Sequence, residues 1–239
     1  TAASVSFNLP IADAARANIT TSLNMLDLAR TCPKLIRLVS VSTAYVTPHP
    51  GDATPIWEVL APLPVPAAKM YASIQDGSAL GAEMLASSGH PNTYTLTKAI
   101  AEHLLVERRG AVPLTIVRPS IISASRKTPF AGWIDSAAGF GAFVVLLGLG
   151  HLRAVIGDSR TRLDLVPVDE VAQRIVLACQ NDTAPIEIRH AVAGFKVSST
   201  VAQCWNDILQ FFRVHRVARR PERRYLGSGG APFKLAEFL

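Results

Sequence analysis

The sequence predicts an α/β fold built on a doubly wound parallel sheet, with helices on both faces. Two observations lead to this architecture. Segments with helical periodicity alternate with segments of strand length in the first half of the chain. The strand-like segments are nearly continuous apolar runs, which is typical of parallel strands buried on both faces. Hydrophobic residues make up 49% of the 239 residues and charged residues 18%, a composition that forms a core and excludes a disordered chain.

The first predicted helix and strand occupy residues 11–30 and 35–41. Apolar residues recur at helical spacing in the first segment, at Ile11, Ala15, Ile19, Leu23, Leu26 and Leu28. After a break at Cys32 and Pro33, the second segment (LIRLVSV) is a short apolar run of strand length. This order gives one helix that leads into one buried strand.

The next pair repeats the same order. Residues 92–109 form the second predicted helix, which ends at Gly110, and residues 114–117 form a buried strand that stops at Pro119. Helix, strand, helix and strand then follow one another. This alternation favours parallel strands joined by helical connections.

The remaining segments break the rhythm. Residues 47–90 are rich in Pro, Ala, Gly and Ser, and we interpret them as a long insertion that contains one helix. Further along, residues 168–180 and 200–212 are predicted helices that flank a strand at residues 186–190. The most apolar stretch, residues 136–150, is shorter than the roughly 20 residues that cross a bilayer. We therefore expect no membrane span.

Cysteine usage and charge bound the partners. The three cysteines, Cys32, Cys179 and Cys204, are far apart and show no metal-ligand spacing, so we expect no disulfide framework, no metal site and a cytoplasmic setting. The net charge of +6 is concentrated in one run, from Arg213 to Arg224, which holds six arginines and one glutamate. Such a run is most often a solvated face, and the alternatives are peripheral contact with anionic lipid and contact with an acidic domain. Without a base-reading motif, we expect no nucleic acid partner.

Tyr94 and Lys98 are the sharpest chemical signal. They lie four residues apart on the predicted helix 92–109, so their Cβ atoms are about 5–6 Å apart on one face. A neighbouring ammonium favours the phenolate and predicts a lowered pKa for Tyr94, which suits an acid or base near neutral pH. Taken alone, this spacing is common on exposed helices, and its context gives it weight.

Polar side chains follow both predicted strands. Ser42 and Thr43 come directly after the strand 35–41, and Arg118, Pro119 and Ser120 close the next strand. Sites in open α/β sheets lie at the carboxyl ends of the strands. A hydroxyl there donates a hydrogen bond to a substrate oxygen that gains negative charge.

These motifs together resemble the extended short-chain dehydrogenases, and within them the fatty acyl-CoA reductases and thioester reductases, which carry the male-sterility-type NAD-binding domain. The shared motifs are Ser-Thr-Ala-Tyr at 42–45, PNTYTLTKAIAE at 91–102, Arg-Pro-Ser at 118–120, PFAGWID at 129–135 and LVPVD at 165–169. Thr43 and Tyr94 lie 51 positions apart, and a long insertion at this place is similar to that subgroup. The resemblance covers residues 1–215.

The resemblance implies roles for particular residues. Tyr94 would donate the proton to the carbonyl oxygen, Lys98 would lower the Tyr94 pKa and hold the nicotinamide ribose, and Thr43 would orient the carbonyl. Asn18 matches a helix asparagine that supports the proton relay, with an ordinary polar helix residue as the alternative. The implied catalytic set is Thr43, Tyr94, Lys98 and Asn18, and the implied cofactor-binding set is Tyr94, Lys98, Pro119 and Ser120.

Two further residues and segments match the family less decisively. Asp169 fits the pattern, and we interpret it as a structural N-cap of the helix that follows. Residues 136–150 either pack in a core, which we favour, or line a channel for an acyl chain. The implied reaction is reduction of a fatty acyl-CoA or acyl carrier thioester by NADPH, which gives a fatty aldehyde or a fatty alcohol.

The resemblance also implies a domain plan. Residues 1–128 would form the C-terminal portion of a Rossmann-like NADP-binding domain with an insertion at 47–90, residues 129–215 a smaller substrate-binding part with the final sheet elements, and residues 216–239 a basic and then Gly-rich tail. No glycine-rich phosphate-binding loop occurs in these 239 residues. We therefore expect a piece of a longer reductase that is inactive alone.

Two other functions remain open. The epimerases and dehydratases of nucleotide sugars share the Tyr and Lys but do not share the PFAGWID stretch. A non-catalytic dinucleotide-binding module is the second alternative, and the lack of a glycine loop gives it weight.

Overall fold

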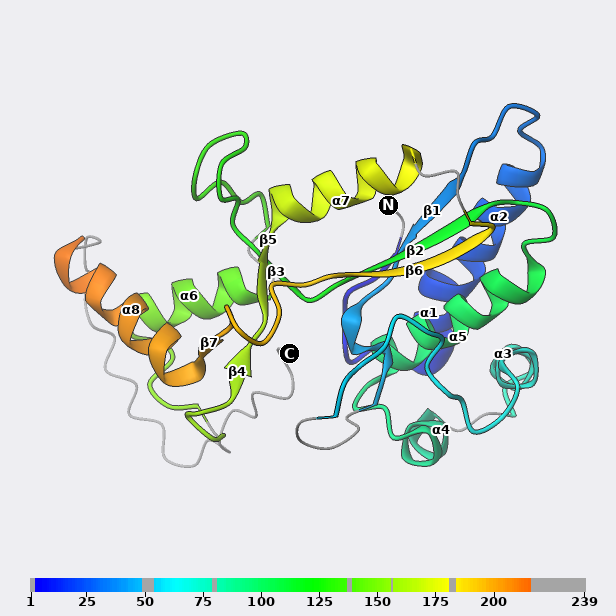
Figure 1. Cartoon of the computed structure of the whole chain (residues 1–239). Helices are drawn as coiled ribbons and strands as arrows, with labels where there is room; N and C mark the ends of the chain where they lie inside the picture. Colours follow the sequence, from blue (N-terminus) through cyan, green and yellow to red (C-terminus); the bar gives the residue numbers. More distant parts are fainter. Residues whose placement is uncertain are drawn as a thin grey trace. The chain divides into compact units, whose positions relative to one another are not determined.

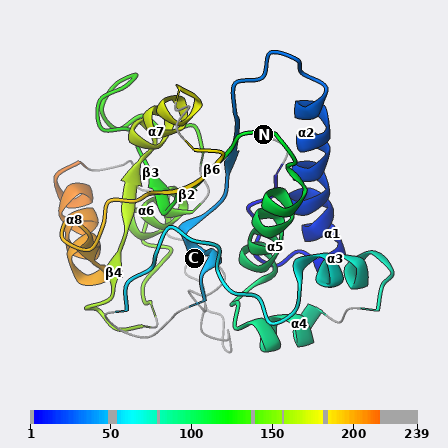
Figure 2. The same ribbon diagram turned by 45° about the vertical axis from the view of Figure 1, so that its right-hand side comes forward.

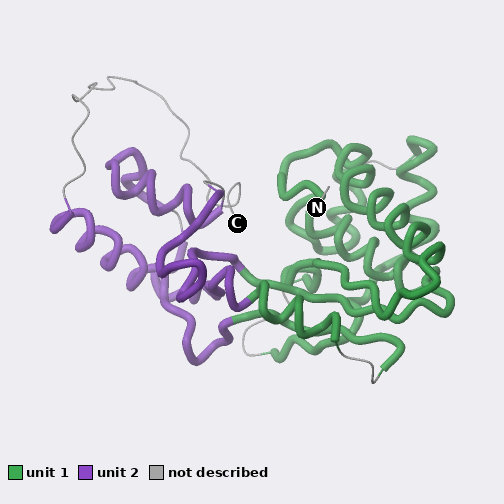
Figure 3. The backbone as a smooth tube through the Cα atoms, turned by 90° about the horizontal axis from the view of Figure 1, so that it is seen from above, with its two compact units in different colours: residues 1–120, 171–192 green, residues 121–170, 193–239 purple. Residues whose placement is uncertain are grey.

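The structure is a computed structural model of the chain, and it describes residues 3–48, 54–78, 81–136, 139–155, 157–180 and 184–215. The chain divides into two compact units, which Figure 3 colours separately. Unit 1 holds residues 1–120 and 171–192, and unit 2 holds residues 121–170 and 193–239. The domain plan with boundaries after residues 128 and 215 stays a prediction, and most of its basic run lies outside the described residues.

A parallel sheet of three strands forms the centre of unit 1 (Figure 1). The strands are β1 (Leu38–Val41), β2 (Leu114–Pro119) and β6 (Ile186–Ala191), in the order β1-β2-β6. Leu38 pairs with Leu114, and Leu114 in turn pairs with Ile186. All six residues of β2 are buried, as expected for the central strand of a sheet that is covered on both faces. The predicted α/β fold with a parallel sheet is confirmed.

Helices lie on both sides of this sheet. The first is continuous over the predicted residues 11–30, as α1 (Ile11–Ala15), the wider π-turn η1 (Arg16–Thr20) and α2 (Thr21–Arg30). The helix α5 (Thr93–Arg108) runs beside them and ends where predicted, at Gly110 with a φ of 59°. Figures 1 and 2 both draw α2 and α5 on one side of the sheet and α7 (Val168–Gln180) on the other.

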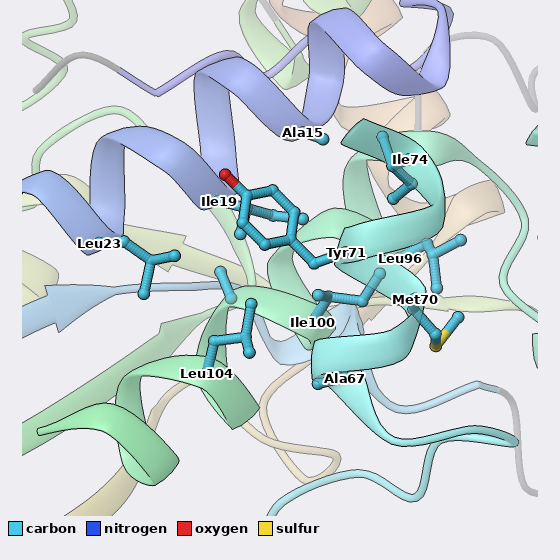
Figure 4. Packing of buried hydrophobic residues seen from close by; sticks show 11 residues of the cluster. Ala15, Ile19, Leu23, Ala67, Met70, Tyr71, Ile74, Leu96, Ile100 and Leu104 are labelled. Carbon is cyan, nitrogen blue, oxygen red and sulfur yellow. The ribbon is translucent and has the colours of Figure 1, made fainter. Parts of the chain in front are cut away.

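The core of unit 1 surrounds α5. One face of α5 meets the N-terminal helices and α3 (Ala67–Gln75), with the Tyr71 ring at the centre of the cluster in Figure 4. The Tyr71 hydroxyl forms a hydrogen bond with the Thr20 hydroxyl at 2.7 Å, so its polar group has a partner within this apolar cluster. A second cluster joins α2 and α5 to the sheet and contains Leu26, Ala29, Leu105, Val112, Leu114 and Ile116. These contacts fix α5 firmly against its neighbours.

The described residues of the insertion between β1 and α5 include two α-helices, where we predicted one. They are α3 and α4 (Gly81–Ser88). Pro66 starts α3, because its fixed φ suits the position before a first helical turn. Gly77, with a φ of 76°, follows the end of α3. The Ala- and Ser-rich composition concealed the second helix, which buries none of its residues completely.

The described residues of unit 2 form short strands and the helices α6 and α8. The strands β3 (Ile121–Ser123) and β5 (Leu165–Pro167) pair in parallel, and β4 (Arg162–Leu163) pairs antiparallel with β7 (Ser199–Thr200). The helices α6 (Phe140–Gly148) and α8 (Val201–Val214) pack on each other. In the described part of the chain, no helix has both the length and the apolar character needed to cross a membrane.

The contact between α6 and α8 depends on a glycine. A Cβ atom added at Gly148 would lie 2.1 Å from Cε2 of Phe212 on α8, far inside van der Waals contact. The apolar stretch that we expected to pack in a core or line a channel thus supplies a helix packed against α8, where Phe143 meets Trp205 at 6.4 Å between ring centroids. The channel itself stays a prediction.

Asp169 does not act as the predicted N-cap. It lies inside the first turn of α7, and its carboxylate accepts hydrogen bonds from the backbone N–H groups of Arg126, Lys127 and Thr128 at 2.9, 2.8 and 3.1 Å. These bonds, with that of Arg126 foremost, lower the pKa of Asp169 to about 2. The role is structural, but it orders a loop from another part of unit 2, which local sequence could not reveal.

Candidate active site

Strand β1 ends in two hydroxyl side chains. The N–H of Ser42 donates to the Val117 carbonyl at 2.7 Å, so the strand stays paired with β2 up to this residue. Thr43 then caps η2 (Ala44–Val46), a single 3-10 turn, and its hydroxyl accepts from the N–H of Tyr45 at 3.3 Å. The turn therefore brings both hydroxyls to the carboxyl end of the parallel sheet, where open α/β folds form their sites.

The first turn of α5 positions Tyr94. Asn92 is the N-cap, and its side-chain oxygen accepts from the N–H of Thr95 at 2.9 Å. The hydroxyl of Thr93 donates to the Leu9 carbonyl at 2.9 Å, which ties the same turn to the N-terminal segment. The ring of Tyr94 packs against Phe7 with 5.6 Å between centroids. These contacts fix the direction of the phenol.

The predicted pair of Thr43 and Tyr94 is brought together. Burial raises the pKa of Tyr94 above its usual 10, and an interaction with the Thr43 side chain opposes this effect. The direction is opposite to the lowered pKa that the spacing to Lys98 predicted. The spacing reports the nearby ammonium, whereas the loss of water around the buried phenol decides the direction. A raised pKa keeps Tyr94 protonated at neutral pH, so it can serve as a proton donor.

Lys98 lies one turn further along α5 and points to the sheet. Its Nζ donates to the carbonyl of Val41, the last residue of β1, at 3.0 Å (Figure 1 shows the two elements). Burial lowers the pKa of Lys98, and the charge of Glu102 raises it. Val41 is its one hydrogen-bond partner among the described residues, and an ammonium has three donors. Two donors of Lys98 therefore remain for other acceptors.

Asn18 reaches the same helix from the π-turn η1. Its side-chain nitrogen donates to the Thr97 hydroxyl at 3.0 Å, and its side-chain oxygen accepts from the N–H of Ser4 at 3.0 Å. The side chain of Asn18 therefore joins the N-terminal segment and η1 to α5, at Thr97, the residue before Lys98. Its own carbonyl accepts from the Ser22 hydroxyl at 2.7 Å. The structure thus joins Asn18 to the helix of Tyr94 and Lys98 through Thr97.

Pro119 and Ser120 end β2 at the same sheet edge. Val41 pairs with Val117, so these residues lie just beyond the point where β1 also ends. The N–H of Ser120 donates to the Ala191 carbonyl of β6 at 3.3 Å. The expected part of Pro119 and Ser120 in cofactor binding stays a prediction.

Two residues that sequence reasoning passed over lie behind the site. Glu102 and Arg118 form a buried ion pair between α5 and β2. Nε of Arg118 lies 3.0 Å from Oε1 of Glu102, and Nη2 lies 2.6 Å from Oε2. Both stood inside the quoted motifs, but no role was assigned to them. The sequence does indicate this pair, because Glu102 follows Lys98 by one helical turn and the charge of Arg118, at the end of a predicted buried strand, needs a partner.

Ser42 adds an unused polar group. Its Oγ atom is buried and has no hydrogen-bond partner among the described residues. A buried hydroxyl without a partner is costly, so it marks a place that a ligand can satisfy. Among the described residues, no group of three His, Cys, Asp or Glu side chains is arranged to hold a metal ion.

Fold and site together define the class. A parallel α/β sheet with a Tyr and Lys pair beside a strand-end Thr is the arrangement of extended short-chain dehydrogenases. The family model described as "Male sterility protein" matches residues 1–175, and the chain belongs to this family. The resemblance that the motifs carry is therefore confirmed.

Curated relatives agree with this assignment. Fatty acyl-CoA reductase 1 of Xenopus laevis is 37% identical over 180 residues, and the human protein of the same name is 35% identical over 180 residues. Each match covers 74% of this chain and 34% of the relative. The chain thus spans about a third of the length of these proteins.

Solved structures show the same fold. The terminal R domain from the myxalamid PKS-NRPS biosynthetic pathway superimposes with a TM-score of 0.60 at 29% identity, over 88% of this chain and 46% of that one. UDP-glucose 4-epimerase from Thermotoga maritima gives a TM-score of 0.57 at 19% identity, over 94% of this chain and 64% of that one. The second similarity concerns the fold alone.

Proposed function

We propose that this chain carries the proton-donating site of a reductase that converts a fatty acyl-CoA or acyl carrier thioester, with NADPH, to a fatty aldehyde or fatty alcohol. The observation that carries the proposal is Tyr94, held in the first turn of α5, interacting with Thr43 and one turn from Lys98. The names of the curated relatives support the substrate class. The activity is proposed for the full-length protein, because the chain spans about a third of those relatives.

The residues present fit a nicotinamide dinucleotide. Two unused donors of Lys98 suit the paired hydroxyls of a ribose, and the unpartnered Ser42 hydroxyl offers a further polar contact at the same edge. Pro119 and Ser120 extend this edge on β2. When bound, the cofactor supplies the hydride that adds to the carbonyl carbon of the thioester.

The chain's own residues handle the proton and the orientation. As the carbonyl oxygen gains negative charge, the Tyr94 hydroxyl donates its proton, and the Thr43 hydroxyl donates a hydrogen bond to the same oxygen. The raised pKa of Tyr94 supplies the protonated form, and the positive charge of Lys98 stabilises the phenolate left behind. Loss of the thiol from the tetrahedral product yields the aldehyde. Asn18 supports this helix through Thr97.

Tyr94→Phe tests the proton donor. The substitution keeps the ring contact with Phe7 and removes the hydroxyl, so turnover on a long-chain acyl-CoA should fall by about 10²-fold or more with little change in substrate binding. Tyr71→Phe is the matched control, because it removes a buried tyrosine hydroxyl on α3 and should keep the parent rate. A Tyr94→Phe enzyme with more than half of the parent turnover would rule out this role.

Lys98→Met tests the second member of the pair. Loss of the ammonium should slow turnover and weaken NADPH binding together, since the same group stabilises the phenolate and contacts the ribose. Fluorescence titration of NADPH and steady-state rates measure the two effects. An unchanged affinity and rate would mean that Lys98 serves only to tie α5 to β1.

Contact with a membrane is a separate proposal. The run from Arg213 to Arg224 carries six arginines, and the proposed substrate is a lipid thioester. Attachment of this run to anionic headgroups would place the protein peripherally on the cytoplasmic side of a membrane.

A further inference from the structure

Helix α5 presents three polar residues to the sheet at intervals of four. Tyr94, Lys98 and Glu102 therefore lie on one face of the helix, in this order. Both carboxylate oxygens of Glu102 accept from Arg118 on β2, from Nε at 3.0 Å and from Nη2 at 2.6 Å. Glu102 is 2% exposed and Arg118 is not exposed at all. The site face thus ends in an ion pair that is shielded from water.

The ion pair lies beside the contact of Lys98. Lys98 bonds to Val41 on β1, and Glu102 bonds to Arg118 on β2. The sheet register pairs Val41 with Val117, so Arg118 is one residue beyond the partner of Val41. Lys98 and Glu102, one helical turn apart on α5, therefore bind adjacent positions on the paired strands β1 and β2. The carboxylate of Glu102 is therefore bound to one buried cation, Arg118, and lies one helical turn from a second, Lys98.

Two opposing effects act on the pKa of Lys98. Burial opposes the charged form of Lys98 and lowers its pKa, and Glu102 acts in the other direction. Without the carboxylate, Lys98 and Arg118 would be two buried cations with no anion between them, and the guanidinium cannot lose its proton. Lys98 would then release its proton at a lower pH.

We propose that Glu102, held in place by Arg118, is a positioning residue that keeps Lys98 protonated at the site. This deepens the proposed function and depends on the part that Lys98 plays in it. The ionisable side chains on the same face of α5 as Lys98 are Tyr94 and Glu102, one turn before it and one turn after it. Arg118 on β2 is bound to Glu102, and the charge of Glu102 acts on Lys98. Burial acts against the charge on Lys98, and the carboxylate of Glu102 is the group that favours it.

The decisive experiment measures the protonation of Lys98 directly. The full-length protein is labelled with ¹³Cε-lysine, and the Lys98 signal is assigned by its loss in Lys98→Met. In Glu102→Gln, which leaves Arg118 in place, the midpoint of this signal should fall by about one pH unit or more. Glu102→Asp retains the charge and should move the midpoint back toward the parent value. Glu102→Gln combined with Arg118→Met removes both charges and should give a midpoint between the parent and the single variant.

The rate profile gives a second readout. The alkaline limb of the turnover profile should move to lower pH in the same order as the Lys98 midpoint. An ion pair with a purely structural role would change thermal stability but leave both the midpoint and the limb in place, and that result would overturn the proposal. If Glu102→Gln does not fold, the double variant, with one buried cation fewer, decides the question by the same comparison with the parent.

Failure of this inference is distinct from failure of the proposed function. If Lys98→Met is as active as the parent, the proposed function is wrong whatever the lysine signal shows. If Lys98→Met is inactive and the lysine midpoint is the same in parent, single and double variants, Glu102 has no part in the charge of Lys98.

Discussion

His90, just before the N-cap of α5, makes the stability of unit 1 depend on pH. The residue is 4% exposed, its Nδ1 lies 3.2 Å from the Thr95 hydroxyl, and its Nε2 has no partner among the described residues. Burial lowers the pKa of His90 from 6.5 to about 4. A second proton on this ring would place a buried cation near the positive end of α5, which is unfavourable.

The size of the effect follows from the two pKa values. In the unfolded chain His90 is protonated below a pH of 6.5, whereas in the folded chain it is protonated only as the pH approaches about 4. The stabilising contribution is therefore complete above pH 6.5 and is lost as the pH falls from 6.5 to about 4. At about pH 5 the two values predict a loss of about 2 kcal/mol, and partial screening by solvent brings the expected loss to about 1–2 kcal/mol.

The variant His90→Asn removes the titration and keeps a donor near the Nδ1 position. Urea unfolding followed by circular dichroism at about pH 7.5 and about pH 5 gives the free energy of unfolding of each protein. The parent should lose about 1–2 kcal/mol more than His90→Asn between these two conditions. His151→Asn replaces an exposed imidazole in unit 2 and should behave like the parent. Equal losses in the parent and in His90→Asn would refute the reasoning.

Three further predictions concern unit 2 and the basic run. Asp169→Asn should speed hydrogen exchange of the amides of residues 126–128 by about tenfold, since a charged acceptor is replaced by a neutral one; unchanged exchange would contradict the ordering of this loop. Gly148→Ala should destabilise unit 2 by about 1–3 kcal/mol, although Ala favours a helix, because the added methyl group overlaps the Phe212 ring. In thermal unfolding, adding Phe212→Leu to this variant should restore part of the lost stability, and a Gly148→Ala protein as stable as the parent would exclude the close contact. Binding to anionic vesicles through residues 213–224 should weaken as salt screens it, and co-sedimentation that is independent of salt would reject the attachment.

Much of the fold could be predicted, because its signals are local. The helix of residues 11–30 and the helix of residues 168–180 agree with the structure in their bounds, since apolar spacing and the breaks that follow are written in consecutive residues. The strand before Ser42 was correctly placed, although it begins at Leu38, three residues later than predicted. The meeting of Tyr94 with Thr43 also followed from general rules, because parallel strands end at one edge.

The rest depends on contacts that are distant in sequence. Asp169 binds a loop more than forty residues away, and Glu102 pairs with a strand residue, so neither partner is visible from local spacing. The pKa direction of Tyr94 depends on burial, which the spacing to Lys98 does not report. In the insertion, α4 buries none of its residues completely and shows no strong apolar stripe.

The π-turn at Arg16–Thr20 takes up one residue more than an α-helical turn, so the helical segments before and after it keep the rotational register of a regular helix that is one residue shorter. Straightening the turn without a deletion would instead rotate the preceding segment by about 100°, carry Ala14 and Ala15 out of the core and break the bond from Ser4 to Asn18. When homologous sequences are aligned, a gap of one residue inside this helix is therefore compatible with the same docking of the N-terminal segment.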